Sequence, residues 1–448
     1  AADINFPNQL HMRIVRSPYA HAKITSIDTA DAAAIPGVVK IWTSKDIADL
    51  PPIDFRADKS SEELKPFRQN VLATDRVRYV GDPVVEVFAE DAYIAEDAAD
   101  LVVINIEPLR VITSADDEPG EFDDGLSSEA GLLTHTYGDV DAAFAAADTV
   151  IELDLRTGRH SGVPMETRGA IGVYDPANDI LKLYGAAKVP HRNRDTLVRM
   201  LARDEDKIEL HEGHTGGGFG IRGELYPEDV LVLVAAQRLG RSIKWIEDRH
   251  EHILNAAHSR DNILHVEVGF DDDGRILAIK NSFLVDSGAY SPVGAAIAGN
   301  SIVHFLGPYD IPHYEADCKI MLTNRTPNAP YRGAGRPEVA FAMERTIDLV
   351  ANALDLDPAE VRLRNMITAD RMPYKVGLVY RDGVSIEYDS GDYPKALRTA
   401  LEELGGLAAI REHQRQALEE GRYLGLGLGC YVEGTGIGPF EGATVKID

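Results

Sequence analysis

The sequence predicts an α+β protein with more than one domain. Its 448 residues exceed one ordinary domain and are enough to build about two or three hydrophobic cores. Short segments in which apolar and polar residues alternate, as in strands, stand among alanine- or leucine-rich segments that are typical of helices. Three stretches rich in glycine, proline, histidine or arginine interrupt this pattern, and we expect the functional residues there.

Residues 1–112 are expected to form a first α+β domain. Its strands follow from alternating patterns and its helix from a run of alanines. The expected elements are strands at 10–15, 38–42 and 102–106, two strands within 75–89 about a Gly-Asp-Pro turn, and a helix over 91–101.

Residues 113–133 are expected to form an acidic linker. The segment is poor in apolar residues and carries many carboxylates: Asp116, Asp117, Glu118, Glu121, Asp123 and Asp124. Such a charge run is usually solvated. We therefore favour a linker over a metal site.

Residues 134–389 are expected to form a second domain around a glycine-rich loop. The loop lies between a strand at 207–210 and a helix that starts at Pro227 and ends before Gly240. The other expected elements are helices at 139–147, 194–201, 337–353 and 358–365, strands at 149–157, 169–174, 181–184 and 241–247, and a hairpin of 263–270 with 276–283.

A third region, 390–448, is expected to be the start of another domain. Residues 393–420 read as a charged helical segment, and a glycine-rich strand is expected from Leu424. Both ends of the chain read as parts of longer elements. We therefore expect a fragment or one part of a split polypeptide.

Composition excludes several classes of partner. The net charge of −27 argues against nucleic acid and anionic membrane surfaces, and no apolar run is long enough to span a membrane. Cys318 and Cys430 form no CxxC pair, so we expect no cysteine-bound iron–sulfur cluster or zinc site in this chain. The two cysteines also provide no disulfide framework, which favours a reducing compartment such as the cytoplasm.

The most informative stretch is the glycine loop, residues 214–223, with the sequence His-Thr-Gly-Gly-Gly-Phe-Gly-Ile-Arg-Gly. Glycines allow positive φ values and close approach of backbone amides to a ligand. Successive amides curled in this way form an anion site. The loop therefore predicts a ligand with phosphate, oxo or sulfido groups, and a plain turn is the alternative.

Residues Gly218–Gly223 also match the GxGxxG dinucleotide fingerprint, which makes an NAD-dependent oxidoreductase the second hypothesis. In that motif the third glycine lies inside the helix. Here three residues separate Gly223 from Pro227, and Glu228 and Asp229 stand where a pyrophosphate would bind. The match to the fingerprint is therefore weak.

Two further stretches carry candidate site residues. Residues 328–338 place Arg332 and Arg336 among prolines and glycines before a helix, where an arginine can bind carboxylates, phosphates or heteroaromatic oxygens. Residues 159–168 include His160, a possible proton carrier. The alternatives are a surface turn for the arginines and a structural histidine. We expect Glu166 to form a structural pair with Arg168 rather than to act as a general base.

The three stretches together resemble the xanthine dehydrogenase, aldehyde oxidase and CO dehydrogenase family, specifically the molybdopterin-binding large subunit of bacterial members. The matching motifs are His-Ser-Gly-Val-Pro-Met-Glu-Thr-Arg at 160–168, Gly-Gly-Gly-Phe-Gly at 216–220 and Ala-Pro-Tyr-Arg-Gly-Ala-Gly-Arg-Pro-Glu at 329–338. Supporting matches lie at 16–22, 78–84, 286–290 and 361–365. The resemblance covers the whole chain.

The resemblance implies a hammerhead α/β domain at 1–112, a first molybdopterin-binding α+β domain at 134–389, and a truncated second one from 390. The implied reaction hydroxylates an N-heteroaromatic or aldehyde carbon with oxygen from water at a molybdenum–molybdopterin centre, with or without a cytosine dinucleotide. The implied partners are a small subunit with [2Fe-2S] clusters, a medium subunit with FAD, and the remainder of the large subunit or a second molybdopterin subunit. A scaffold without cofactor is the non-enzymatic alternative.

The resemblance also assigns residues. Phe219 would present its backbone N–H to an oxo ligand of molybdenum, with Gly217, Gly218 and Gly220 in the cofactor loop. Arg332 would border the substrate and stabilise negative charge. His160 falls where xanthine-oxidising members carry a glutamine. No side chain is expected to bind the metal directly.

Three departures from the family pattern limit the expected activity. A substrate-binding glutamate of xanthine-oxidising members aligns with Gly223, or with Glu224 after a shift by one residue, so xanthine is not expected. A cysteine of CO-oxidising members aligns with Gly333, so CO is not expected. The family's catalytic glutamate is expected downstream, outside these residues.

Overall fold

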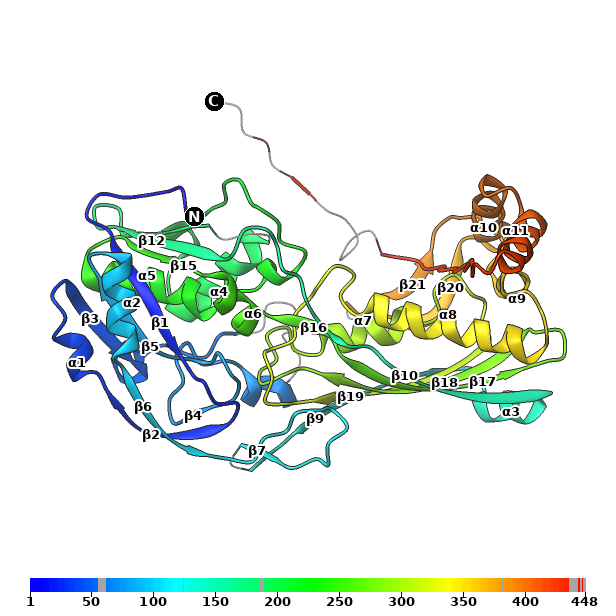
Figure 1. Ribbon diagram of the computed structural model, residues 1–448, viewed down its shortest axis with the longest axis horizontal. Helices are drawn as coiled ribbons and strands as arrows, with labels where there is room; N and C mark the ends of the chain where they lie inside the picture. Colours follow the sequence, from blue (N-terminus) through cyan, green and yellow to red (C-terminus); the bar gives the residue numbers. More distant parts are fainter. Residues whose placement is uncertain are drawn as a thin grey trace.

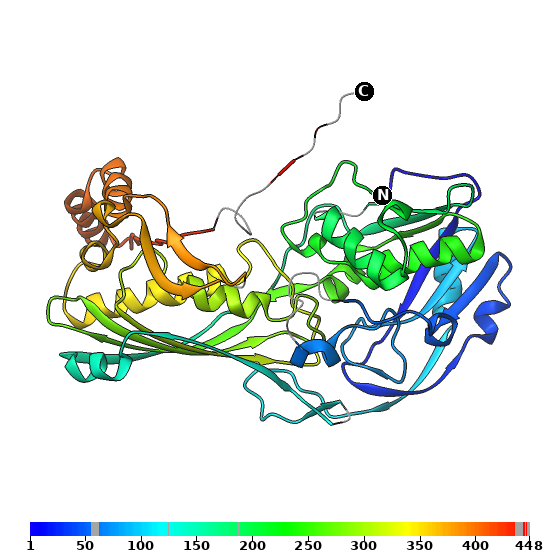
Figure 2. The same cartoon turned by 180° about the vertical axis from the view of Figure 1, so that it is seen from behind.

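The computed structural model describes residues 1–54, 62–123, 125–185, 189–380 and 382–434, together with 442, 443 and 445. They form two lobes that lie side by side (Figures 1 and 2). One lobe contains a seven-stranded sheet and the other a five-stranded sheet. The predicted α+β fold class is confirmed, because helices pack on both sheets without a regular strand–helix alternation.

The seven-stranded sheet combines two distant parts of the chain. Its order is β14-β13-β12-β15-β1-β5-β3, and β1 pairs in parallel with β15, so that Leu10 lies opposite Ile243. The segment 1–112 therefore shares its sheet with residues 169–246. The strands are β1 (Leu10–Arg16), β3 (Val38–Thr43), β5 (Pro83–Ala89), β12 (Gly169–Asp175), β13 (Ile180–Tyr184), β14 (Ile208–His211) and β15 (Ile243–Ile246).

The two strands expected within 75–89 belong to different sheets. Strand β4 (Arg76–Val77) joins β2 (Ala22–Asp28) and β6 (Val103–Pro108) in a three-stranded sheet. Strand β5 lies in the seven-stranded sheet. The turn between them folds inward, because the buried carboxylate of Asp82 accepts a hydrogen bond of 2.9 Å from the Arg78 backbone N–H.

The five-stranded sheet has the order β10-β17-β18-β19-β9. Strands β17 and β18 form the expected hairpin, and β18 pairs in parallel with β19. Helix α8 (Arg336–Ala353) packs on this sheet through an apolar face that includes Val339, Met343 and Ile347. The strands are β9 (Glu129–Tyr137), β10 (Thr149–Arg156), β17 (Asn262–Phe270), β18 (Ile276–Asp286) and β19 (His313–Met321).

The structure differs from the expected linker at 113–133. Strands β7 (Glu121–Asp123) and β8 (Leu126–Ser127) pair, and β9 begins at Glu129. Phe122 is fully buried, and Arg76 Nη1 lies 2.6 Å from the carboxylate of Asp123. Carboxylates that suggest a solvated segment can instead pair with arginines from distant strands, and the local sequence does not reveal those partners. Asp124 lies outside the described residues.

Helix α5 fixes the end of the glycine loop. Its residues from Val230 to Ala236 are all buried against the seven-stranded sheet. A Cβ on Gly172 of β12 would lie only 2.0 Å from the carbonyl oxygen of Val232, so glycine is required for this close approach. The helices around this sheet are α1 (Ala30–Ala33), α2 (Ala92–Asp100), α4 (Pro190–Leu201), α5 (Pro227–Leu239) and α6 (Arg249–Asn255).

The C-terminal region differs from the expectation in two ways. The expected helical segment at 393–420 consists of two helices separated at Gly405 and Gly406, which have φ values of +92° and +87°. The expected strand from Leu424 pairs with no other strand in the described part of the chain, and residues 435–441 lie outside it. The remaining elements are α3 (Val140–Ala146), α7 (Ala296–His304), α8 (Arg336–Ala353), α9 (Pro358–Asn365), α10 (Tyr393–Glu403), α11 (Leu407–Glu419), β20 (Tyr374–Val379) and β21 (Ser385–Tyr388).

The chain passes between the two lobes along a short two-stranded sheet. Strand β11 (Arg159–Ser161) leads from β10 towards β12, and β16 (His258–Arg260) leads back to β17. The two strands pair antiparallel, with His160 opposite Ser259. His160 therefore lies at the junction of the lobes. None of the described helices is long and apolar enough to cross a membrane.

Candidate active site

The glycine loop adopts the backbone conformation that its composition predicts. Gly217 and Gly220 have φ values of +103° and +113°, and Phe219 between them has a φ of +55°. Positive φ is uncommon for a bulky residue, so the surrounding structure must hold Phe219 in place. Phe219 is exposed, at 44 % of the residue's accessible area.

The tip of the glycine loop contacts the arginine segment directly. The backbone N–H of Arg332 donates a hydrogen bond of 2.7 Å to the carbonyl oxygen of Phe219. Gly220 packs against the same segment, because a Cβ at this position would lie 2.2 Å from the carbonyl oxygen of Pro330. Two of the three predicted motifs therefore meet through their backbones.

The loop provides backbone donors that fit an oxo- or phosphate-bearing ligand. The amides of Gly217, Gly218, Phe219 and Gly220 donate no hydrogen bond to any described residue. At Gly218 a Cβ would meet only the Cβ of Arg222, at 3.8 Å, so this face of the loop is open. Successive amides without a partner among the described residues can bind the oxygens of an anionic ligand.

The arginine and histidine predicted for the site are both exposed. Neither the Arg332 guanidinium nor the His160 imidazole makes a hydrogen bond with a described residue. Arg332 thus has free donors in a planar arrangement, and His160 can donate and accept. Both groups are available to a ligand.

Arg260 connects the histidine strand with the arginine segment. It lies in β16 beside the residue that pairs with His160, and its guanidinium donates to the carbonyl oxygens of Tyr331 at 3.3 Å and Arg332 at 2.8 Å. Its charge is balanced by the buried carboxylate of Glu338, 3.2 Å away. Burial raises the pKa of Glu338, and Arg260 opposes that rise.

The structure corrects the expected pair of Glu166 with Arg168. Glu166 Oε2 instead accepts hydrogen bonds from Arg222 Nη1 at 2.8 Å and from the Gly216 backbone N–H at 2.7 Å. Burial opposes ionisation of Glu166, but these donors outweigh it and lower its pKa. Glu166 therefore joins the histidine motif to the glycine loop.

Arg168 belongs to a buried ionic network next to the loop. Its Nε donates to Glu247 at 3.0 Å, and its Nη1 lies 3.4 Å from Glu228. Glu228 also pairs with Arg16 of β1. Burial opposes ionisation of Glu247, but the Arg168 charge and the hydrogen bonds from His252 and Arg168 together outweigh it and lower the pKa of Glu247 to about 2. The network ties the first strand of the chain to α5 and β15.

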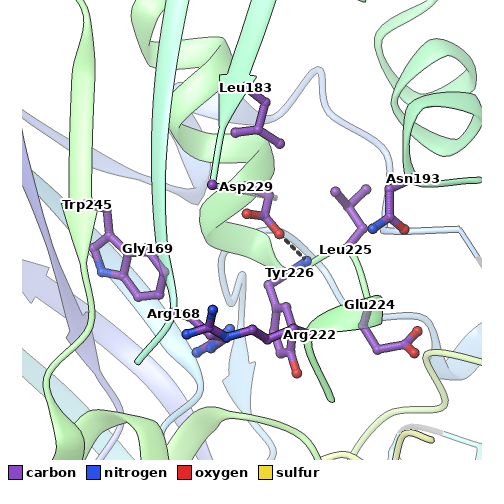
Figure 3. Close-up of a pocket in the computed structure, with 11 residues that line it drawn as sticks. Arg168, Gly169, Leu183, Asn193, Arg222, Glu224, Leu225, Tyr226, Asp229 and Trp245 are labelled. Atoms are coloured by element: carbon purple, nitrogen blue, oxygen red, sulfur yellow. Dashed lines mark hydrogen bonds between the residues drawn. The ribbon is translucent and has the colours of Figure 1, made fainter. Parts of the chain in front are cut away.

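A pocket begins at the end of the glycine loop, at Arg222 and Glu224, and is called the pocket behind the loop. Figure 3 shows the residues that line it. Glu224 lines it together with Arg222, and the Asn193 side-chain amide donates 3.2 Å to the carbonyl oxygen of Gly223. Arg332, His160 and Phe219 do not line this pocket. Its lining residues are Arg168, Gly169, Leu183, Gly185, Asn193, Arg222, Glu224, Leu225, Tyr226, Asp229 and Trp245.

The local structure disfavours the dinucleotide reading of Gly218–Gly223. Gly223 ends a short 3₁₀ turn, Ile221–Gly223, and lies outside α5. The first turn of α5 contains the fully buried Glu228, which is paired with Arg16 and Arg168. A pyrophosphate at this helix end would meet a carboxylate instead of free amides.

Sequence reasoning missed two residues that hold the site together, Arg222 and Arg260. Arg222 stands inside the glycine loop, and an arginine there could have suggested a partner carboxylate. Arg260 gives no local signal, since its contacts with Tyr331 and Arg332 bridge about 70 residues of chain.

Comparisons with known proteins identify both parts of the chain. Residues 124–366 match the family model of a molybdopterin cofactor-binding domain, and residues 1–110 match the a/b hammerhead domain of aldehyde oxidase and xanthine dehydrogenase. The 6-hydroxypseudooxynicotine dehydrogenase complex subunit gamma of Paenarthrobacter nicotinovorans is 39% identical over 100% of this chain and 57% of its own length. Nicotine 6-hydroxylase large subunit from the same organism is 36% identical over 97% of this chain and 53% of its own length.

A solved structure agrees with this assignment. Quinoline 2-oxidoreductase from Pseudomonas putida 86 superposes with a TM-score of 0.86 at 33% identity, covering 94% of this chain and 53% of that chain. The chain thus spans about half the length of these three relatives, of which one is named as a subunit of a complex and another as a large subunit. This chain belongs to the xanthine dehydrogenase and aldehyde oxidase family of molybdopterin-binding proteins.

Proposed function

We propose that the protein acts as the large subunit of a molybdenum hydroxylase, which adds a water-derived oxygen to a carbon of an N-heteroaromatic ring or an aldehyde. The observation that carries this proposal is the contact of Arg332 N–H with the carbonyl oxygen of Phe219. It brings the loop whose amides 217–220 have no partner among the described residues against the segment that carries the exposed Arg332 guanidinium. The amides can hold an oxo-bearing cofactor, and the guanidinium can hold a polar substrate.

The chain's own residues have distinct roles in this proposal. When bound, a molybdenum–molybdopterin cofactor, with or without a cytosine dinucleotide, would supply the redox chemistry. The Phe219 N–H would donate to the cofactor, with Gly217, Gly218 and Gly220 allowing close approach. Arg332 would donate to the substrate, where negative charge develops. His160 would hydrogen-bond beside the cofactor.

The substrate proposed first is an N-heteroaromatic ring. Relatives named for nicotine and quinoline support this class over an aldehyde. Gly223 offers no carboxylate for xanthine, and Glu224 lines the pocket behind the loop rather than the surface of Arg332. Gly333 offers no thiol for the CO reaction.

The proposed partners follow the family. They are a small subunit with [2Fe-2S] clusters, a medium subunit with FAD, and the remainder of the large subunit or a second molybdopterin subunit. Names such as "subunit gamma" and "large subunit" among the relatives support a complex of this kind. The proposed location is the cytoplasm.

The test uses the complex isolated with its native partners. Metal analysis should find about one molybdenum per large subunit. With a dye as electron acceptor, the complex should oxidise pyridine- or quinoline-type rings faster than aldehydes, and product formed in ¹⁸O-labelled water should carry the label. A complex without molybdenum, or product oxygen from O₂, would contradict the proposal.

Variants of Arg332 test the assigned role. Arg332→Ala should keep its molybdenum but lose about 10²–10³-fold in kcat, because a donor to developing charge is removed. The kcat of Arg332→Lys should lie between those of the wild type and Arg332→Ala, since lysine keeps the charge without the planar donor pair. The control is Arg345→Ala, an exposed arginine of α8 that pairs only with Asp348 among the described residues. Unchanged turnover in Arg332→Ala would refute the role.

The two rival functions predict other results. An NAD-dependent enzyme would bind NAD in calorimetry and lose that affinity in Gly220→Ala. A scaffold would contain no molybdenum and oxidise none of the substrates. Either pattern would replace the molybdenum hydroxylase proposal.

A further inference from the structure

A single carboxylate holds both ends of the glycine loop. Glu166 Oε2 accepts from the backbone N–H of Gly216, at the start of the loop, and from Arg222 Nη1, at its end. The Glu166 backbone N–H also donates 3.1 Å to the carbonyl oxygen of Gly216. The segment before β12 therefore binds the loop through both its side chain and its backbone.

Arg222 reinforces this arrangement. Its Nη2 donates to the backbone carbonyl oxygens of Glu166 and Thr167. The residue is buried, with only 7% of its area exposed. Four of the contacts between the loop and residues 166–167 thus involve a charged side chain, and hydrogen bonds with a charged donor or acceptor are stronger than neutral ones.

The space around Gly216 shows how tightly the loop start is fitted. A Cβ at this position would lie 2.5 Å from the Cβ of Glu166. Between Gly216 and Arg222 lie the three residues with positive φ and the four amides without a described partner. Beyond Glu166, the loop is held at Phe219 by Arg332 and at Gly220 by Pro330.

A glycine-rich loop loses more conformational entropy on ordering than any other kind of segment. If the two ends of the loop were not fixed, amides 217–220 would sample many orientations. Only some of these orientations point the amides at one ligand atom. A carboxylate that fixes the loop ends reduces this cost before any ligand binds. Residues that orient the groups contacting a metal centre in this way commonly change affinity or activity about 10–100-fold when removed.

We propose that Glu166 is a positioning residue that holds the glycine loop, through Gly216 and Arg222, in the shape that presents amides 217–220 to the molybdenum cofactor. The proposal rests on the proposed function. The competing role for a half-buried carboxylate near the site is proton transfer. Glu166 Oε2 already accepts two hydrogen bonds, and the lowered pKa of Glu166 keeps it ionised near neutral pH.

The first experiment measures the loop itself and needs no turnover. Hydrogen–deuterium exchange of residues 214–223 is compared between the cofactor-free wild-type complex, Glu166→Ala and Glu166→Gln. The alanine variant should exchange about tenfold faster or more at Gly216, whose donor bond is lost. The glutamine variant should stay within about threefold, because its amide oxygen can still accept from Gly216. Unchanged exchange in Glu166→Ala would overturn the proposal.

The second experiment measures the loaded enzyme. Glu166→Ala should retain about 10–100-fold less molybdenum, or show an altered electron paramagnetic resonance spectrum of the metal, and Glu166→Gln should largely restore both. Full molybdenum content and an unaltered spectrum, with turnover lost in both variants, would overturn positioning in favour of proton transfer. The pH profile of kcat in Glu166→Gln should keep its wild-type shape.

Two controls make the result unambiguous. Glu152→Gln removes an exposed carboxylate from β10 in the other lobe and should change neither exchange at 214–223 nor molybdenum content. Arg222→Lys is the second variant, for use if Glu166→Ala folds poorly. It preserves the charge but loses the fork of donors, so it should also speed exchange in residues 214–223. A wild-type complex without molybdenum would refute the proposed function, whereas the exchange result in cofactor-free protein would still decide the role of Glu166.

Discussion

At the scale of single residues, the site is built from backbone groups as much as from side chains. Phe219 contributes its carbonyl oxygen and Arg332 its N–H to the contact between their segments, and the proposed contact of Phe219 with the cofactor also uses a backbone group, its N–H. The predicted groups His160, Phe219 and Arg332 come from three segments that are far apart in the sequence. Gly220 lets two of these segments touch, because it packs directly on the Pro330 carbonyl.

Gly220→Ala should therefore disturb the site more than a typical surface change. The new methyl would lie 2.2 Å from the Pro330 carbonyl oxygen, at a φ of +113°. We expect a loss of about 1–3 kcal/mol in the free energy of unfolding and reduced molybdenum content. The matched control is Gly213→Ala, where nothing lies within 4 Å of the added Cβ. Equal unfolding curves for the two variants would contradict the close contact of Gly220 with the Pro330 carbonyl oxygen.

His258 should make stability depend on pH. Burial, and then the charge of Arg159, lowers the pKa of His258 to about 4 from its usual 6.5. The folded protein then binds fewer protons than the unfolded chain between these values. This contribution to stability is complete above pH 6.5 and is lost as the pH falls towards 4.

Urea unfolding at several pH values tests this linkage. As the pH falls from 6.5 to 4, the free energy of unfolding of the wild type should decrease by about 1–3 kcal/mol more than that of His258→Gln. His265→Gln is the control with opposite sign, because the hydrogen bond that the His265 ring donates to the Asp154 carboxylate raises the pKa of His265. Its contribution is present below pH 6.5 and is lost as the pH rises through the folded pKa. Parallel pH profiles for wild type and His258→Gln would refute the assignment.

At the scale of elements, buried ion pairs determine which strands and helices adjoin the loop. Arg16 of β1 and Arg168, which precedes β12, share the carboxylate of Glu228 in α5. Arg168 also lies over the Tyr226 ring, at 3.9 Å from the centroid. These contacts orient α5, whose start defines where the glycine loop ends.

Arg168→Met should be strongly destabilising, by about 3–5 kcal/mol, because Glu228 and Glu247 lose a shared cation in a buried place. Adding Glu247→Gln should recover part of the loss, since one uncompensated charge is removed. Arg415→Met, on the exposed face of α11, should change the unfolding free energy by about 0.5 kcal/mol or less. Chemical denaturation measures all three, and a loss in Arg168→Met no larger than in Arg415→Met would contradict a structural role for the network.

At the scale of the whole molecule, the two lobes do not follow the order of the chain. The seven-stranded sheet unites residues 10–89 with 169–246, and the five-stranded sheet unites 129–156 with 262–321. The chain crosses between them along β11 and β16, and His160 stands on that crossing. Both the site and the buried network lie where these connections meet.

Native-state hydrogen exchange should reveal this organisation. Amides of β1, β5, β12 and β15 should open as one cooperative unit with a common free energy, although they are far apart in sequence. Amides of β17, β18 and β19 should form a second unit. If β1 and β5 instead opened separately from β12 and β15, the shared sheet would not be a folding unit.

The sequence alone determined the local features. Alternation and capping located most strands and helices, and glycine content predicted the positive φ values at Gly217 and Gly220. The motifs around His160, Phe219 and Arg332 indicated the family, which the comparisons confirm. These features depend on neighbouring residues, so short stretches of sequence contain them.

Only the tertiary structure decided which distant groups meet. It paired Glu166 with Arg222 instead of Arg168, joined β1 to β15, turned Glu224 into the pocket behind the loop, and placed Phe122 in a core within an acidic segment. Any arginine can satisfy a given carboxylate, and any strand edge can pair with another. The choice among them depends on the packing of the complete fold, which no local pattern encodes.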